Sequence, residues 1–142
     1  QEASSALETL MAAQPGEKLQ PETNANIMAN MMLMDHRKIH MNDFVKKYQQ
    51  LPGNTYQTAT GAETVFNQLY GPMYLAQQKG LESIILHGNE PSPSGETMMG
   101  IMTRTDLPND VKNSLARAFL INQGLSADEI AIMGDIASVL GG

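Results

Sequence analysis

The segment from residue 21 to residue 50 limits the folds open to this chain more than any other feature. Pro21 suits the first turn of a helix, where its missing N–H has no helical partner to lose. Apolar residues then recur every three or four positions until Leu51, Pro52 and Gly53 stop the pattern. The spacing predicts one long central helix over residues 21–50.

Three further segments carry a helix-start signal, in which a hydroxyl residue is followed three positions later by glutamate. The signals are Ser5 with Glu8, Thr60 with Glu63, and Ser126 with Glu129. Together with the proline and glycine stops, they predict helices over 4–14, 61–87, 96–104, 108–123 and 126–140, with a loop at 88–95. Gly71 and Pro72 lie inside the 61–87 segment, so we expect a kink or a split there.

The composition favours an all-α fold. Aromatic residues make up only 5% of the 142 residues and Trp is absent, so the core must rely on Leu, Ile, Ala and Met. Such a core suits helices better than strands. We predict one compact domain, residues 1–142, of about five to six helices with a C-terminal helical hairpin at 108–140. A subdivision into 1–87 and 96–142, around the loop at 88–95, is the alternative.

The charge distribution argues against nucleic-acid binding. The formal net charge is −6, and the basic residues form no long positive face of the kind that contacts phosphates. The last two predicted helices have the outline of a helix-turn-helix, but the second contains no Lys or Arg. The uncharged stretch at 23–34 is too short to cross a bilayer. We therefore expect neither a nucleic-acid partner nor a membrane span.

Methionine is concentrated in the first half of the long predicted helix. On a helical wheel, one apolar stripe, interrupted only by a lysine, joins Ile27, Met31, Met34, Lys38, Met41, Val45 and Tyr48. Residues 27–34 are apolar on nearly every side, a pattern typical of a helix that is enclosed by the fold or docked on a partner.

Methionine also suits partner surfaces, because its side chain adapts to the partner's shape. We predict that Met28, Met31, Met32 and Leu33 bind a partner, and that part of Met28, Met32 and Leu33 is exposed in the isolated chain.

A second hypothesis for the same helix is a metal site. His36 and His40 stand one turn apart and Asp43 follows one turn later, on a face that the wheel predicts to be solvated. Zinc peptidases need glutamate directly after the first histidine, and that position is Arg37. Methionine thioethers and imidazoles suit copper. The alternative function is therefore a small Met/His protein that binds copper or zinc.

Signals for catalysis are absent. The chain has no glycine-rich phosphate loop, no nucleophile elbow and no cysteine, so we predict no catalytic residue and no cofactor. The favoured function is a non-catalytic protein–protein interaction or assembly subunit, binding a protein partner or a second copy, in secretion or envelope machinery or a viral particle. Because the chain begins at Gln1, an exported location (periplasmic or secreted) is favoured.

Overall fold

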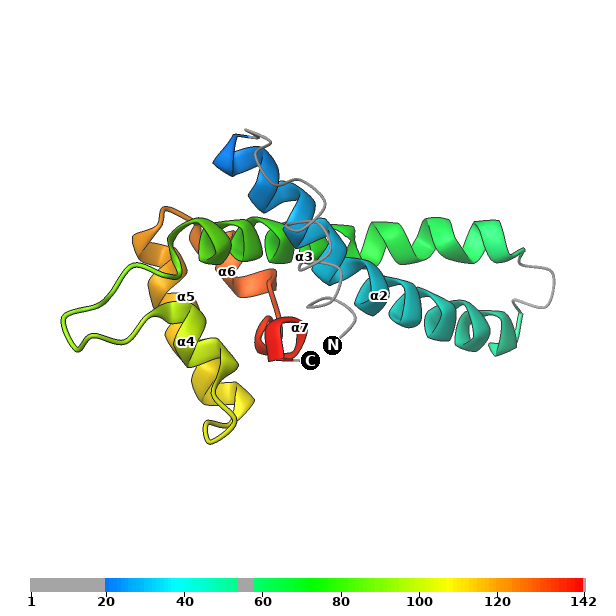
Figure 1. The fold of residues 1–142 in the computed structure, drawn as a ribbon. Helices are drawn as coiled ribbons and strands as arrows, with labels where there is room; N and C mark the ends of the chain where they lie inside the picture. The colour runs from blue at the N-terminus through cyan, green and yellow to red at the C-terminus, as the bar shows by residue number, and fades with distance from the viewer. Residues whose placement is uncertain (1–19, 54–57, 142) are drawn as a thin grey trace.

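The computed structural model of this chain describes residues 20–53 and 58–141, which form helices and no strand (Figure 1). The helices are α2 (Pro21–Gln50), α3 (Ala59–His87), α4 (Met98–Thr103), α5 (Asn109–Asn122), α6 (Ala127–Ile132) and α7 (Ala137–Gly141). The all-α prediction is confirmed. The predicted helix at 4–14 and its Ser5 signal lie outside the described residues. Within the described residues, no helix has the length and apolar character that a membrane crossing requires.

The two long helices follow the predicted bounds closely. α2 begins at Pro21 and ends where the N–H of Leu51 bonds to the carbonyl of Tyr48. α3 starts earlier than predicted, because the Thr58 hydroxyl accepts a hydrogen bond from the Gly61 N–H at 3.0 Å. The prediction that Thr60 caps this helix is therefore wrong.

α3 also runs unbroken through Gly71 and Pro72, so the predicted split is absent. Proline removes one helical hydrogen bond, the one to the carbonyl of Gln68. Both Pro72 and Gln68 are exposed, so water can hydrate that carbonyl. The helix therefore tolerates the proline at this position.

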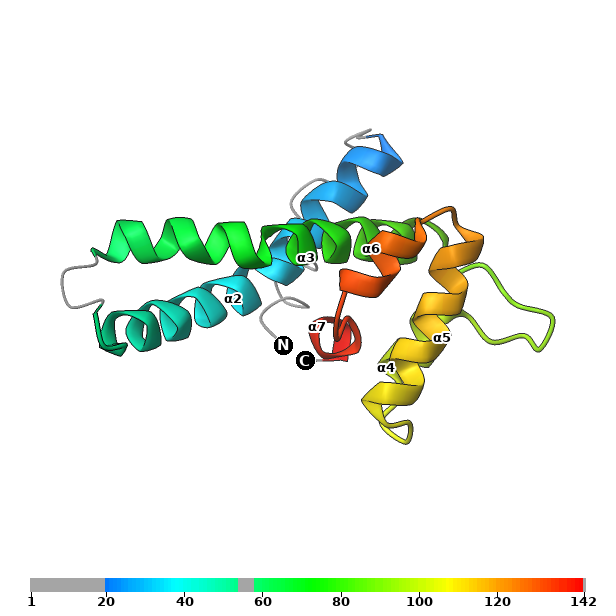
Figure 2. The ribbon, with the colours of Figure 1, turned by 180° about the vertical axis from the view of Figure 1, so that it is seen from behind.

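α2 and α3 form a two-helix arm that projects away from the other helices (Figures 1 and 2). We define the arm as residues 36–50 of α2 and 59–72 of α3. The second half of α3, residues 73–87, instead lies among α4, α5, α6 and α7, and we call this group the C-terminal bundle. The first half of α2 crosses α3 between the two regions.

The single helix predicted at 126–140 is wrong, because the chain turns between α6 and α7. The capping box of Ser126 and Glu129 does start α6 as predicted. The helix then stops before Gly134, whose φ of +70° only glycine adopts readily. The backbone N–H of Ser138 bonds to the Asp135 carboxylate at 3.1 Å, and this contact begins α7. The predicted hairpin is therefore α5 followed by two short helices.

The core lies mainly in the C-terminal bundle. Among the described residues, the large side chains that are completely buried are Phe66, Leu81, Ile84, Met102, Leu120, Met133 and Ile136. Only Phe66 belongs to the arm. The helices approach closely at Gly80, where an added Cβ would stand 2.9 Å from Cδ1 of Ile136. A larger residue there would require the side chains of Ile136, Met133 and Leu120 to shift.

Candidate functional site

The methionine-rich segment of α2 is turned differently from the predicted stripe. Its buried residues are Ala25, Ala29, Met32 and Leu33. Of the three residues of which part was expected to be exposed, Met32 is 8% exposed and Leu33 is 5% exposed, so that exposure is confined to Met28. Met28 and Met31 are half-buried, whereas Met34 is 60% exposed. Small alanines let α3 approach closely, and this close packing, rather than methionine spacing, selects the buried face.

Because α2 is turned about its axis relative to the predicted stripe, His40 faces α3 and not solvent. Nδ1 of His40 and the Tyr74 hydroxyl are 2.7 Å apart, within hydrogen-bond distance. The imidazole also meets the edges of Phe66 and Tyr70, with ring centroids 4.8 and 4.5 Å away. Burial raises the pKa of the Tyr74 hydroxyl, which therefore stays neutral near pH 7. The predicted solvated histidine face is wrong for this residue.

The predicted metal residues do not converge. Asp43 pairs with Lys47 at 2.9 Å, while Nδ1 of His40 is engaged by Tyr74. Over the two described ranges, no three His, Asp or Glu side chains are placed to hold a metal ion together. The set of His36, His40 and Asp43 is therefore not assembled as a site.

Most of the aromatic residues of this aromatic-poor chain gather between α2 and α3, four of them in the arm and Tyr74 just beyond it. The chain has four Tyr and three Phe. Five of these seven rings lie within contact distance of one another between α2 and α3: Phe44, Tyr48, Phe66, Tyr70 and Tyr74.

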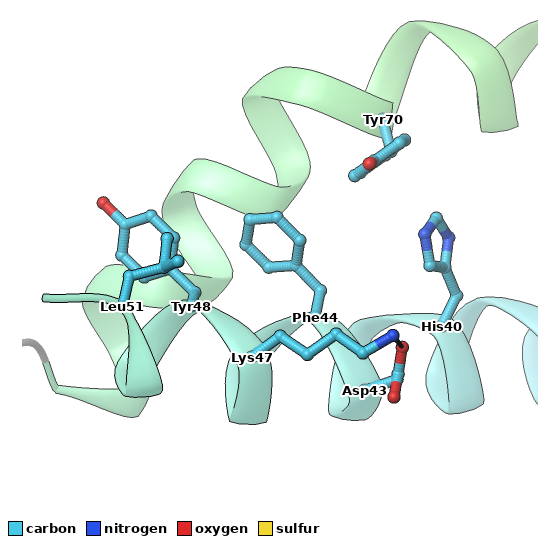
Figure 3. A pocket seen from close by; sticks show the side chains of 7 residues that line it. All are labelled: His40, Asp43, Phe44, Lys47, Tyr48, Leu51 and Tyr70. Carbon is cyan, nitrogen blue, oxygen red and sulfur yellow. Dashed lines mark ion pairs between the residues drawn. The ribbon is translucent and has the colours of Figure 1, made fainter. Parts of the chain in front are cut away.

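Some of these rings line an open pocket of about 300 Å³ (Figure 3). Phe44 and His40 point from α2 toward α3, and Tyr70 points back from α3. The ion pair of Asp43 and Lys47 lies on the outer side of α2. The pocket therefore has aromatic walls and an ion pair at its edge.

A larger groove of about 470 Å³ lies between the same two helices. Its lining residues are Asn30, Leu33, Met34, Arg37, Gly71, Tyr74, Leu75 and Gln78. Met34 and Leu75 are 60% and 63% exposed. Arg37 is the one charged residue of the lining; it donates to Asn67 at 3.0 Å and stands 5.4 Å from the centre of the Tyr74 ring. We call this the Met34 groove.

A third pocket, of about 290 Å³, lies where α2 and α3 meet α7 and the link before it. Its lining residues are His36, His40, Met73, Tyr74, Gln77, Asp135, Ser138 and Val139. We call this the junction pocket. It joins residues about a hundred positions apart in the sequence. Residue spacing along the chain therefore gives no indication of this pocket, nor that Gln77 and Asp135 belong to one site.

The comparisons with known proteins identify no relative: no family model, no curated protein and no solved structure matches this chain. The function proposed below therefore depends on the three concave surfaces and on the side chains that line them.

Proposed function

We propose that this chain is a non-catalytic protein-interaction or assembly subunit, and that the Met34 groove receives the partner. The observation that supports this is the pair of exposed apolar side chains, Met34 and Leu75, beside a concave surface floored by Leu33 and Tyr74. Exposed apolar residues that border a groove are typical of protein-binding sites. Such a subunit fits secretion or envelope machinery or a viral particle.

The groove fits a helical segment that carries an apolar side chain and a carboxylate. The apolar side chain would lie between Met34 and Leu75. Arg37 is the one charged lining residue, in a chain whose net charge is −6, so the groove differs in sign from the chain as a whole. A guanidinium matches the geometry of a carboxylate. Gln78 and Asn30 would supply the polar rim.

The predicted partner residues contribute unequally to this proposal. Leu33 lines the groove from beneath, and Met32 belongs to the core. Met28 and Met31 lie earlier on the same helix and are half-buried. We therefore assign the main contact to Met34 and keep Met28 and Met31 as flanking contacts.

The test is a selection from a phage-displayed library of helical peptides on the folded chain. We expect enriched peptides to carry an apolar residue with Asp or Glu three or four positions away, since those positions share a helix face. Met34→Asp should abolish their binding. Ile39→Asp is the matched control, because Ile39 is 70% exposed on the same helix but does not line the groove.

Three outcomes bear on the proposal. Binders that tolerate Met34→Asp and Leu75→Asp, or a selection that enriches no peptide, would refute it. Weaker binding of acidic peptides to Arg37→Gln would support the assigned carboxylate. Dimerisation in sedimentation velocity that Met34→Asp abolishes and Ile39→Asp preserves would make the partner a second copy and overturn the choice of a separate protein.

A further inference from the structure

The junction pocket is built by three separate parts of the chain. α2 supplies His36 and His40, α3 supplies Met73, Tyr74 and Gln77, and the region after α6 supplies Asp135, Ser138 and Val139. The pocket therefore lies where the arm meets the C-terminal bundle. Ligand sites favour such boundaries between structural units.

Gln77 presents an acceptor with no donor. Its side chain is 5% exposed, and its Nε2 donates to the carbonyl of Met133 at 2.8 Å. That bond fixes the orientation of the amide. The other end, Oε1, is the one buried side-chain N or O atom in the described residues that has no hydrogen-bond partner. A buried acceptor without a hydrogen bond lowers the folding stability by about 1–3 kcal/mol, so a ligand that donates a hydrogen bond to it gains a favourable contact.

The charge of the pocket favours a cation. Burial raises the pKa of Asp135, but hydrogen bonds from Ser138 and Asn113 outweigh it, and the net pKa is below the usual value. The carboxylate is therefore ionised near pH 7. No Lys or Arg is among the lining residues; Arg117 reaches the Gly134 carbonyl nearby at 3.4 Å without joining the lining.

One of the two histidines, His36, adds a further acceptor in its neutral form. The described structure gives His36 no hydrogen-bond partner, and His40 uses only Nδ1, toward Tyr74. A neutral imidazole offers one ring nitrogen as an acceptor. The pocket thus combines a carboxylate, an amide oxygen without a hydrogen-bond donor and the imidazole of His36, and no Lys or Arg in its lining competes for them.

From this combination we infer that the junction pocket binds a primary ammonium group, either of a small free amine or of a lysine side chain on a partner. The ammonium would donate to Oε1 of Gln77 and lie near the Asp135 carboxylate. Because Oε1 is enclosed, a neighbouring side chain must move aside. Met73 is half-buried, unbranched and therefore suited to that movement. This site is separate from the Met34 groove, so either proposal can fail alone.

The experiment is an NMR titration of the folded chain with n-butylammonium, following the side-chain amide signals of Gln77 and the imidazole signals of His36 and His40. We expect saturable shifts at these residues. Tetramethylammonium has the same charge but no N–H donor, so it should cause none. Asp135→Asn should weaken binding by about tenfold or more, because a charge-assisted contact is lost. Asp128→Asn is the matched control, since Asp128 is an exposed acid of α6 outside the pocket.

A second arm of the experiment separates the two sources of the ammonium. N-acetyl-lysine N-methylamide that produces the same shifts would identify a lysine side chain as an acceptable ligand, whereas shifts from butylammonium alone would restrict the pocket to free amines. Equal binding of tetramethylammonium, unchanged affinity in Asp135→Asn, or no saturable shift at Gln77 would overturn the inference.

Discussion

The arm and the C-terminal bundle bury their side chains to different degrees. In the bundle, Leu120, Met133 and Ile136 have no exposed surface, and several helices surround them. Among the large side chains of the arm, only Phe66 is enclosed to that extent, while Phe44 and Tyr70 are half-buried. Two helices enclose fewer side chains than a bundle does, so the arm relies on large rings that cover area along one interface.

Because of this difference, the bundle contributes most of the stability, whereas the arm and its boundary present the accessible side chains. Enclosed aliphatic side chains contribute most to the free energy of unfolding, and a mostly aliphatic bundle needs few polar contacts. The half-open arm and its boundary leave Met34, Leu51, Leu69 and Leu75 exposed by half or more. Regions with few enclosed contacts also open at lower free energy. The surfaces proposed for binding therefore lie where the arm and the first half of α2 meet the bundle, not in the enclosed core of the bundle.

The largest expected effect is in the bundle. Leu120→Ala removes a side chain with no exposed surface, next to the close approach at Gly80. We expect the free energy of unfolding to fall by about 3 kcal/mol, because the cavity cannot collapse among helices that already touch. Urea denaturation followed by circular dichroism measures this. A loss similar to that of a surface substitution would show that the bundle is not the stable region.

A smaller effect is expected in the arm. Phe44→Ala removes a half-buried ring that stacks on Tyr48 and tilts against Phe66. We expect a loss of about 2 kcal/mol, roughly half the cost of deleting a completely buried ring.

Amide hydrogen exchange sharpens this second prediction. In Phe44→Ala, amides of residues 36–50 and 59–72 should exchange faster, while those of α5 should keep their protection. Equal acceleration in both regions would mean that arm and bundle unfold as one unit.

Much of the fold could be predicted from the sequence, because its signals are local. Pro21, the stop at Pro52 and Gly53, and the capping box of Ser126 each act within a few residues, and each appears in the structure. Gly134 was missed as a helix stop. The apolar spacing from Ile130 to Leu140 continues across it, and the side-chain bonds that favour a turn come partly from Asn113, a distant residue.

The candidate site was far less predictable. The helical wheel favours the stripe through Met31 and Met34 because these are large apolar residues, whereas the buried face of α2 contains the small residues Ala25 and Ala29 together with Met32 and Leu33. His40 was assigned to solvent for the same reason. The Met34 groove and the junction pocket each combine residues from separate helices, and a single sequence contains no record of such contacts.

At the boundary between arm and bundle, we expect an effect on the free energy of unfolding that is smaller than that of Phe44→Ala. Asp135 accepts hydrogen bonds from Ser138 and Asn113, and Asp135→Asn should cost about 1 kcal/mol near pH 7, similar to the loss of a helix cap. The folded-state pKa of Asp135 lies below its usual value of 3.8. Its stabilisation is therefore complete above that value and is lost as the pH falls through the folded pKa.

The melting temperatures of the two proteins should thus differ by a constant amount above about pH 5 and converge below about pH 4. The other carboxylates are the same in both proteins, so their contribution to the pH dependence cancels in the difference between the two melting temperatures. A difference that persists unchanged in acid would assign the effect to packing and not to the charge of Asp135.

The smallest effect is expected for the ion pair on the arm. Lys47 and Asp43 lie 2.9 Å apart, but their side chains are 75% and 56% exposed. Water screens such a pair, so Lys47→Ala should change the free energy of unfolding by no more than about 0.5 kcal/mol. The comparison with Phe44→Ala then decides what supports the arm, because both residues line the same aromatic pocket. If Lys47→Ala is as costly as Phe44→Ala, an exposed ion pair within α2 supports the arm as much as ring packing between α2 and α3 does, and the contrast between arm and bundle fails.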